Sequence, residues 1–198
     1  MMWDLAWAVV PFAISMTASP GPNNVMITAS ATNFGFKRTV PPLLGIAAGL
    51  GVMMLLVGVG LGRLLETFPI VHVALKYVGT AYLLYLAWRI ATSSPPGEGE
   101  TKAKPLSFWE AALFQWVNPK TWVAALSAMT MYISADGNAV MQALVIAAVF
   151  ALISLPSVGA WALFGQAAAR LLRTPQNLRV FNLIMATLLA LSVITLFI

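Results

Sequence analysis

The sequence has no cysteine, a single histidine and few charged residues. The absence of cysteine excludes disulfides, thiolate metal sites and thiol nucleophiles. The chain contains neither an HExxH nor a CxxC motif, so we expect no metal site and no cofactor. Only 9% of the residues are charged, against about 25% in ordinary soluble domains. The basic residues flank apolar stretches and form no aromatic-rich face, so we expect no nucleic-acid partner.

Acidic residues are especially scarce, with six in 198 residues, and none lies at the centre of an apolar stretch. Asp4 and Glu110 lie near the ends of such stretches. A relay of carboxylates that carries protons across a membrane is therefore not expected. The chain also lacks a GxSxG motif and a Ser/His/Asp set, which argues against an intramembrane hydrolase. These absences predict a protein that is not an enzyme.

What the chain does contain is apolar sequence. Hydrophobic residues make up 60% of it, and the mean hydropathy is +0.86, so we expect an integral membrane protein. About 20 apolar residues are needed to cross a bilayer as a helix. We expect an all-α protein with six transmembrane helices, at about residues 5–31, 40–62, 70–90, 108–133, 139–164 and 178–198. The first stretch lacks a basic leader, so we expect it to be retained rather than cleaved as a signal peptide.

A polar linker at about residues 92–107 divides this single transmembrane domain into two halves, at about 1–91 and 108–198. Each half has three spans, so the second half enters the membrane upside down, as a 3+3 inverted repeat. The loops after spans one, three and five carry eight basic residues, against Arg63 alone on the opposite side. The eight are Lys37, Arg38, Arg89, Lys102, Lys104, Arg170, Arg173 and Arg179. The positive-inside rule then places both termini outside the cytoplasm.

The first apolar stretch of each half is interrupted by proline, at SPGPNN (residues 19–24) and at VNPK (residues 117–120). Proline breaks a helix because it lacks an N–H. Paired interruptions at corresponding positions of two halves indicate the substrate site of a transporter. Each break exposes N–H groups and carbonyls, which suit the carboxylate and ammonium of a small zwitterion. The predicted substrate-binding residues are Pro20, Gly21, Pro22, Asn23, Asn24, Gln115, Asn118, Pro119 and Lys120.

Lys120 is the one charge placed centrally in a predicted span. An intramembrane ionisable residue is a functional hypothesis by default, either as a ligand for a substrate carboxylate or as a proton carrier. Two alternatives remain open, because a lysine can also cap carbonyls or extend to a headgroup. The asparagines have a similar alternative, in which they merely satisfy the freed backbone. Further candidates for coupling or pocket lining are Lys76, Tyr82, Tyr85 and Glu110.

The second apolar stretch carries two pairs of glycines, Gly45/Gly49 and Gly58/Gly62, each with four-residue spacing. Such pairs allow two helices to approach closely. Packing within one subunit is the favoured interpretation, and a homodimer interface is the alternative.

Together these motifs resemble the LysE/RhtB-type amino-acid exporter family. The chain has PGPN at Pro20–Asn23, followed by the turn Gly35-Phe36. It also has the family's LK-x2-G-x2-YL pattern from Leu75 and its NPK from Asn118. PGPNN, ATS-P from Ala91, SFW and FQ-x-VN look most like the cysteine/O-acetylserine exporter branch. The chain departs from the wider pattern at Ala111 and Gln115, where many members have glycine and asparagine.

The resemblance implies export of amino acids driven by the proton gradient. We therefore predict a secondary transporter that exports small zwitterionic amino acids, or close derivatives, by alternating access. Protons are the expected coupling ion, and membrane lipid is the expected surrounding partner. Two alternatives are a channel for small solutes and a membrane assembly protein that transports nothing.

Overall fold

The computed structural model describes residues 2–62, 67–93, 104–134, 137–172 and 174–197. The regular structure of these residues is helical and includes no strand, which confirms the all-α prediction for the described chain. The helices are α1 (Met2–Ala18), α2 (Pro22–Phe34), α3 (Phe36–Leu56), which continues as η1 (Val57–Leu61), α5 (Pro69–Ala91), α6 (Phe108–Phe114), η2 (Gln115–Val117), α7 (Pro119–Tyr132), α8 (Ala139–Leu171) and α9 (Pro175–Leu191), which continues as η3 (Ser192–Leu196).

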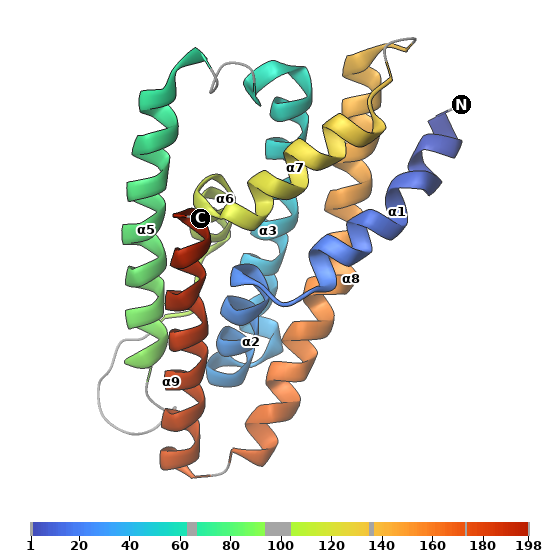
Figure 1. Cartoon of the computed structure of the whole chain (residues 1–198). Helices are drawn as coiled ribbons and strands as arrows, with labels where there is room; N and C mark the ends of the chain where they lie inside the picture. The colour runs from blue at the N-terminus through green and yellow to red at the C-terminus, as the bar shows by residue number, and fades with distance from the viewer. Residues whose placement is uncertain (1, 63–66, 94–103, 135–136, 173, 198) are drawn as a thin grey trace.

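The chain passes back and forth between the two ends of the bundle, with α1 and α7 oblique to the other long helices (Figure 1). It descends through α1 and α2, ascends through α3, descends through α5, ascends through α7, descends through α8 and ascends through α9. Three helical segments of the described chain are long and apolar enough to cross a membrane by length and composition: Phe36–Leu61, Ala139–Leu171 and Pro175–Leu196. A shorter apolar helix, Met2–Ala18, precedes them.

Four of the described basic residues lie where helices end at the lower side of Figure 1, whereas Lys76 and Lys120 lie elsewhere in α5 and α7. Lys37 and Arg38 lie in the first turn of α3, Arg89 in the last turn of α5 and Arg170 in the last turn of α8. Arg63, Lys102 and Arg173 lie outside the described residues, as do positions 94–103 of the predicted linker. The described residues therefore carry positive charge at the end where the predicted cytoplasmic loops begin.

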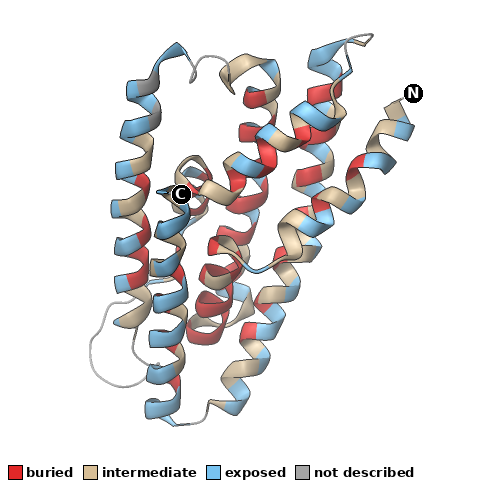
Figure 2. Ribbon diagram, in the orientation of Figure 1, coloured by how far each residue is buried: buried red, intermediate tan, exposed pale blue. Residues whose placement is uncertain are grey.

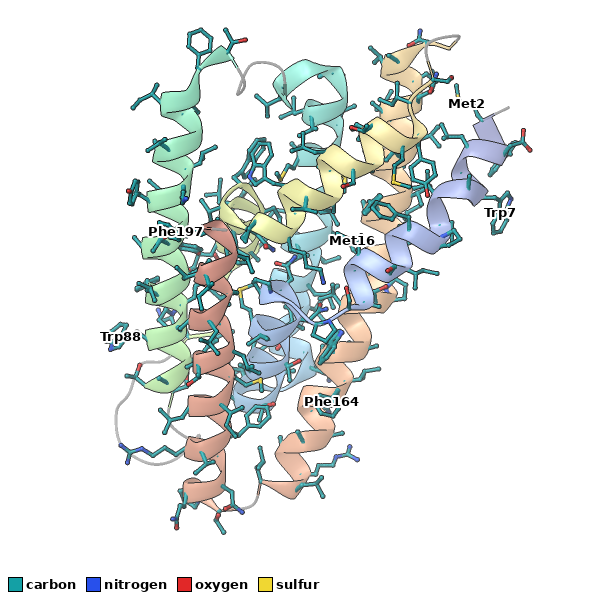
Figure 3. All side chains as sticks on the ribbon, in the orientation of Figure 1. Met2, Trp7, Met16, Trp88, Phe164 and Phe197 are labelled. Carbon is teal, nitrogen blue, oxygen red and sulfur yellow. The ribbon has the colours of Figure 1, made fainter. Side chains whose placement is uncertain are left out.

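The distribution of polarity is that of a protein surrounded by lipid. Large apolar side chains cover the outside, and Trp7 (72% exposed) and Trp88 (62% exposed) project from the bundle (Figure 3). Buried polar side chains lie inside instead, and many of them belong to α2, which is almost entirely buried (Figure 2). A helix that is buried all round has to satisfy its polar groups within the protein. This places α2 at the centre of any polar site.

Glycines let α3 approach α6 at backbone distance. A Cβ atom added to Gly45 would collide with the carbonyl oxygen of Phe108, and one added to Gly49 would lie 2.8 Å from Ala112 Cα. The other pair also faces its own chain, because Gly58 contacts Ala143. These contacts support packing within one subunit for both glycine pairs.

Gly49→Ala is expected to destabilise the protein by about 1–3 kcal/mol, because the added methyl group meets backbone that cannot move aside. Gly51→Ala, on the same helix, is the matched control, since its methyl group would meet only Ala151 Cβ at 3.2 Å and Ala147 O at 3.7 Å. Thermal unfolding in detergent measures both. Equal losses for the two variants would contradict close packing of α3 on α6.

Candidate functional site

The first interruption separates α1 from α2. α1 ends at Ala18, Gly21 is extended (φ 178°, ψ 179°), and Pro22 is the first residue of α2. Gly21 has no side chain to cap the N–H groups of the first turn of α2. The carbonyls of residues 17–20 all accept hydrogen bonds from side chains. Asn24 Nδ2 donates to Thr17 (3.0 Å) and Ser19 (2.8 Å), Trp161 Nε1 donates to Ala18 (2.9 Å), and Lys120 Nζ donates to Ser19 and Pro20.

The second interruption lies between η2 and α7. Asn118 leaves the helical conformation (φ −84°, ψ 111°), and Pro119 begins α7. Asn118 caps this helix, because its Oδ1 accepts a hydrogen bond from Lys120 N at 3.1 Å. Side-chain caps of this kind stabilise a helix start by about 1 kcal/mol. The amide of Asn118 therefore has a structural role that the sequence left open.

A pair of amides joins the two interruptions. Asn23 Nδ2 donates to Gln115 Oε1 at 2.9 Å, and Gln115 Nε2 donates to Asn23 Oδ1 at 3.0 Å. Gln115 is fully buried, and its Oε1 also accepts from Thr121 Oγ1 at 3.1 Å. Residues 92 positions apart in the sequence are thus held face to face. The structure brings the predicted residues of the two halves into one place.

Lys120 reaches across this junction to the first interruption. Its Nζ donates to Ser19 O (2.6 Å), Ser19 Oγ (2.8 Å) and Pro20 O (3.2 Å). No carboxylate of the described residues forms an ion pair with it. The side chain passes beside Gly21, where an added Cβ would lie 2.8 Å from Lys120 Cδ. Of the interpretations left open by the sequence, this conformation matches a lysine that caps carbonyls.

A small cavity of about 30 Å³ lies at this junction. Its polar lining comprises Thr17, Asn23, Asn24, Asn118, Lys120, Thr121 and Ser154. Met16 belongs to its apolar lining and lies on α1 near the first interruption (Figure 3). The cavity has room for one or two water molecules and none for an amino acid. Asn24 is 2% exposed, and its Oδ1 has no hydrogen-bond partner among the described residues. Such an acceptor needs a water or a ligand.

The secondary candidates do not reach this cavity. Lys76 Nζ lies 4.1 Å from the centroid of the Phe197 ring near the end of the chain, a cation–π contact. The Tyr82 hydroxyl donates to the Glu110 carbonyl at 3.4 Å, and the Glu110 carboxylate pairs with Arg89 at 2.7 Å. Tyr85 packs 6.1 Å from Tyr82, measured between ring centroids. Three of the four candidates therefore gather around Glu110, and Lys76 lies elsewhere.

A second amide pair was missed by the sequence reasoning. Asn33 and Asn182 are both buried and exchange hydrogen bonds of 2.8 and 2.9 Å, and Asn182 also donates to Ser93 O at 3.1 Å. This network joins α2 to α9 and to the end of α5. An isolated amide in the last apolar stretch was the available signal, because polar groups at membrane depth require partners.

Comparisons with known proteins identify relatives over nearly the whole chain. The family model described as LysE type translocator matches residues 14–198. The chain is 33% identical over 187 residues to the cysteine/O-acetylserine efflux protein of Escherichia coli (strain K12), covering 94% of each chain. The protein of the same description from Shigella sonnei (strain Ss046) matches equally, and that of Escherichia coli O1:K1 / APEC is 32% identical over the same coverage. No solved structure matches the chain.

These matches confirm the predicted resemblance, including the branch. Translocators and efflux proteins move solutes and are not enzymes, which also confirms that prediction. A helical fold with an apolar exterior is the fold that such a membrane protein requires. The chain belongs to the LysE-type translocator family.

Proposed function

We propose that this protein exports a small neutral amino acid across the bacterial inner membrane in exchange for protons. Transport would proceed by alternating access around the cavity between the two interruptions. Six spans, arranged as a 3+3 inverted repeat with both termini outside, would form the pathway. The interrupted spans would be α1 with α2 and α6 with α7.

Packing between helices supports the inverted repeat. The second and fifth spans, α3 and α8, pack together, as do the third and sixth, α5 and α9. The first span, formed by α1 and α2, packs on α8, and in the other half α6 packs on α3 in the same way. Contacts of α2 with α9 have a counterpart in those of η2 with α5. These correspondences support a two-fold relation between the halves, although α2 packs more extensively on α8 than α7 does on α3.

The position of the Lys120 ammonium is the observation that carries the proposal. Two carbonyls and a hydroxyl within 3.2 Å form a cage for a –NH₃⁺ group, and an amino acid presents the same group. In the proposed cycle the substrate ammonium displaces Lys120 from this cage. Asn24 Oδ1, which lacks a partner among the described residues, supplies a further acceptor. The displaced lysine then faces the substrate carboxylate.

The chemistry of the lining favours a small neutral side chain. Ile46, Leu50, Ala124, Phe150 and Val158 complete the cavity, and its described lining contains no acidic residue to pair with a cationic side chain. The relatives are described as exporting cysteine and O-acetylserine, both small and uncharged in the side chain. Of the described lining residues, Lys120 alone carries a proton that can be exchanged, so we assign it the coupling.

Transport by purified protein in vesicles tests this proposal. Wild-type protein is expected to move O-acetyl-L-serine with saturable kinetics, faster when protons can flow in the opposite direction. Lys37→Met serves as a control, because Lys37 is exposed in the first turn of α3. It should transport like the wild type. Flux that ignores both substrate concentration and the pH gradient would indicate a channel. Absence of flux for every small amino acid would indicate an assembly role.

A further inference from the structure

A second and much larger cavity lies near the basic end of the bundle. Its volume is about 660 Å³, and it lies between α2, the last turns of α5 and residues 104–110. Sites for small molecules have volumes of about 300–1,000 Å³. This cavity can therefore hold an amino acid in the conformation described, whereas the small cavity at Lys120 cannot.

The lining of this cavity brings opposite charges together. Arg89 Nη1 donates to Glu110 Oε1 at 2.7 Å, and Arg89 Nη2 donates to Lys104 O at 2.8 Å. Glu110 Oε2 accepts from Ser107 N at 2.8 Å, in a capping box that fixes the carboxylate. The rest of the described lining is neutral apart from Lys104. The cavity thus offers a fixed guanidinium and a fixed carboxylate to one ligand.

This ion pair is available to a ligand because it is only half-buried. The side chains of Arg89 and Glu110 are 22% and 38% exposed. Pairs with this exposure add little to stability, since water already screens the charges. A bound zwitterion can take over both halves of this ion pair. Its carboxylate replaces Glu110 on the guanidinium of Arg89, and its ammonium replaces Arg89 on the carboxylate of Glu110. The exchange leaves no charge unpaired.

We infer that this cavity is a separate binding site for small zwitterionic amino acids, with Arg89 and Glu110 as its ligands. The role we assign to this site is to load substrate from the cytoplasm, and that role rests on the proposed function. Two elements connect it to the small cavity. Glu110 precedes Gln115 by five residues, about 7.5 Å at helical rise, and Gln115 is hydrogen-bonded to Asn23, which lines the small cavity. α2 lines the large cavity with Met26 and the small one with Asn24.

An anionic phospholipid is the competing ligand, because Arg89 and Lys104 are both basic. Glu110 opposes it, since an anionic headgroup would meet the carboxylate without offering an ammonium. Zwitterionic chemistry therefore fits the described lining better. The experiment below includes a lipid arm to separate the two ligands.

The test measures substrate affinity and transport rate separately in the full chain, with substrate supplied from the basic end. In Arg89→Gln and in Glu110→Gln, the KM for O-acetyl-L-serine is expected to rise about tenfold, because each substitution removes one charge-assisted hydrogen bond to the substrate. The maximal rate should change little. Arg38→Gln is the control, because Arg38 is an exposed arginine at the same end, and it should leave KM unchanged.

Analogues identify which group each residue holds. L-serinamide lacks the carboxylate, and N-acetyl-L-serine lacks the ammonium. Arg89→Gln should reduce the advantage of L-serine over L-serinamide as a competitor, and Glu110→Gln should reduce its advantage over N-acetyl-L-serine. A merely structural ion pair would alter stability and leave both ratios as in the wild type, which would overturn the inference.

Two further outcomes separate this inference from the proposed function. Vesicles with and without phosphatidylglycerol compare lipid occupancy, and a KM that follows the lipid rather than the analogues would assign the cavity to lipid. Equilibrium binding of L-serine to protein in nanodiscs does not depend on transport. One outcome is a wild type that binds L-serine but transports nothing, with binding weakened in Arg89→Gln. This outcome would support the binding site and reject the proposed export function. Transport with unchanged KM in both variants would do the reverse.

Discussion

Lys120→Met is expected to lower net export by about 100-fold, equivalent to roughly 2.7 kcal/mol, while exchange of internal for external substrate continues. Methionine keeps most of the length of the side chain and removes its charge. Net export requires the empty protein to return across the membrane, and exchange does not. Export and exchange measured in the same vesicles distinguish the two steps.

The geometry explains why the two rates should separate. In the empty state the Lys120 ammonium donates to the carbonyls of Ser19 and Pro20, and its removal leaves Ser19 O with Asn24 as its one side-chain donor. Hydrogen bonds to a charged group contribute about 1.5–3 kcal/mol. Bound substrate supplies its own ammonium to the same carbonyls, so the loaded state loses only the contact of Lys120 with the substrate carboxylate. The variant therefore stalls when empty and proceeds when loaded.

Gly21→Ala provides an independent version of this test. The added methyl group would lie 2.8 Å from Lys120 Cδ and 3.1 Å from Nζ, so it pushes the side chain out of the cage without removing the charge. Because a flexible side chain moves rather than backbone, the loss of stability should stay small. Net export should again fall more than exchange. Equal loss of both rates in Lys120→Met and Gly21→Ala would contradict a role for Lys120 in the empty state.

The sequence predicted much of this arrangement from local rules. Hydropathy identified the apolar segments, and the prolines at positions 20 and 119 identified where an amide-rich junction would form. Hydropathy and proline breaks are both properties of residues that are adjacent in the chain, so they can be recognised directly in the sequence. The meeting of Asn23 with Gln115 followed from pairing the two halves.

The partner of Lys120 could not be predicted in the same way. Ser19 lies 101 positions away, and the choice between a carbonyl cage and a ligand carboxylate depends on side-chain direction. The same limit applies to Asn33 and Asn182, whose contact spans 149 positions. The pairing of Arg89 with Glu110 is equally hidden, because it depends on how the polar linker returns to α5. Long-range contacts of this kind are set by packing, and local sequence patterns do not contain them.

The amide pair that joins the two halves permits the second strong prediction. Gln115→Leu is expected to destabilise the protein by about 1–3 kcal/mol, because Asn23 and Thr121 then lose buried partners. Asn23→Leu should cost less, because Gln115 keeps Thr121 Oγ1 and Ala111 O as hydrogen-bond partners. The double variant should recover part of the stability, since two apolar side chains can pack where two amides were bonded.

Export should not recover with stability in that double variant. Asn23 lines the small cavity at Lys120, and the amide pair fixes the first turn of α2 against the residues before α7. Leucines at both positions retain the contact between the halves and remove its polarity and direction. We therefore expect export to stay at least about tenfold below the wild type, a loss of 1.4 kcal/mol or more in the transport barrier. Unfolding temperature and export rate, measured on the same three variants, decide the matter. If export returned together with stability, the amide pair would only hold the two halves together, and the substrate would not depend on its polar atoms.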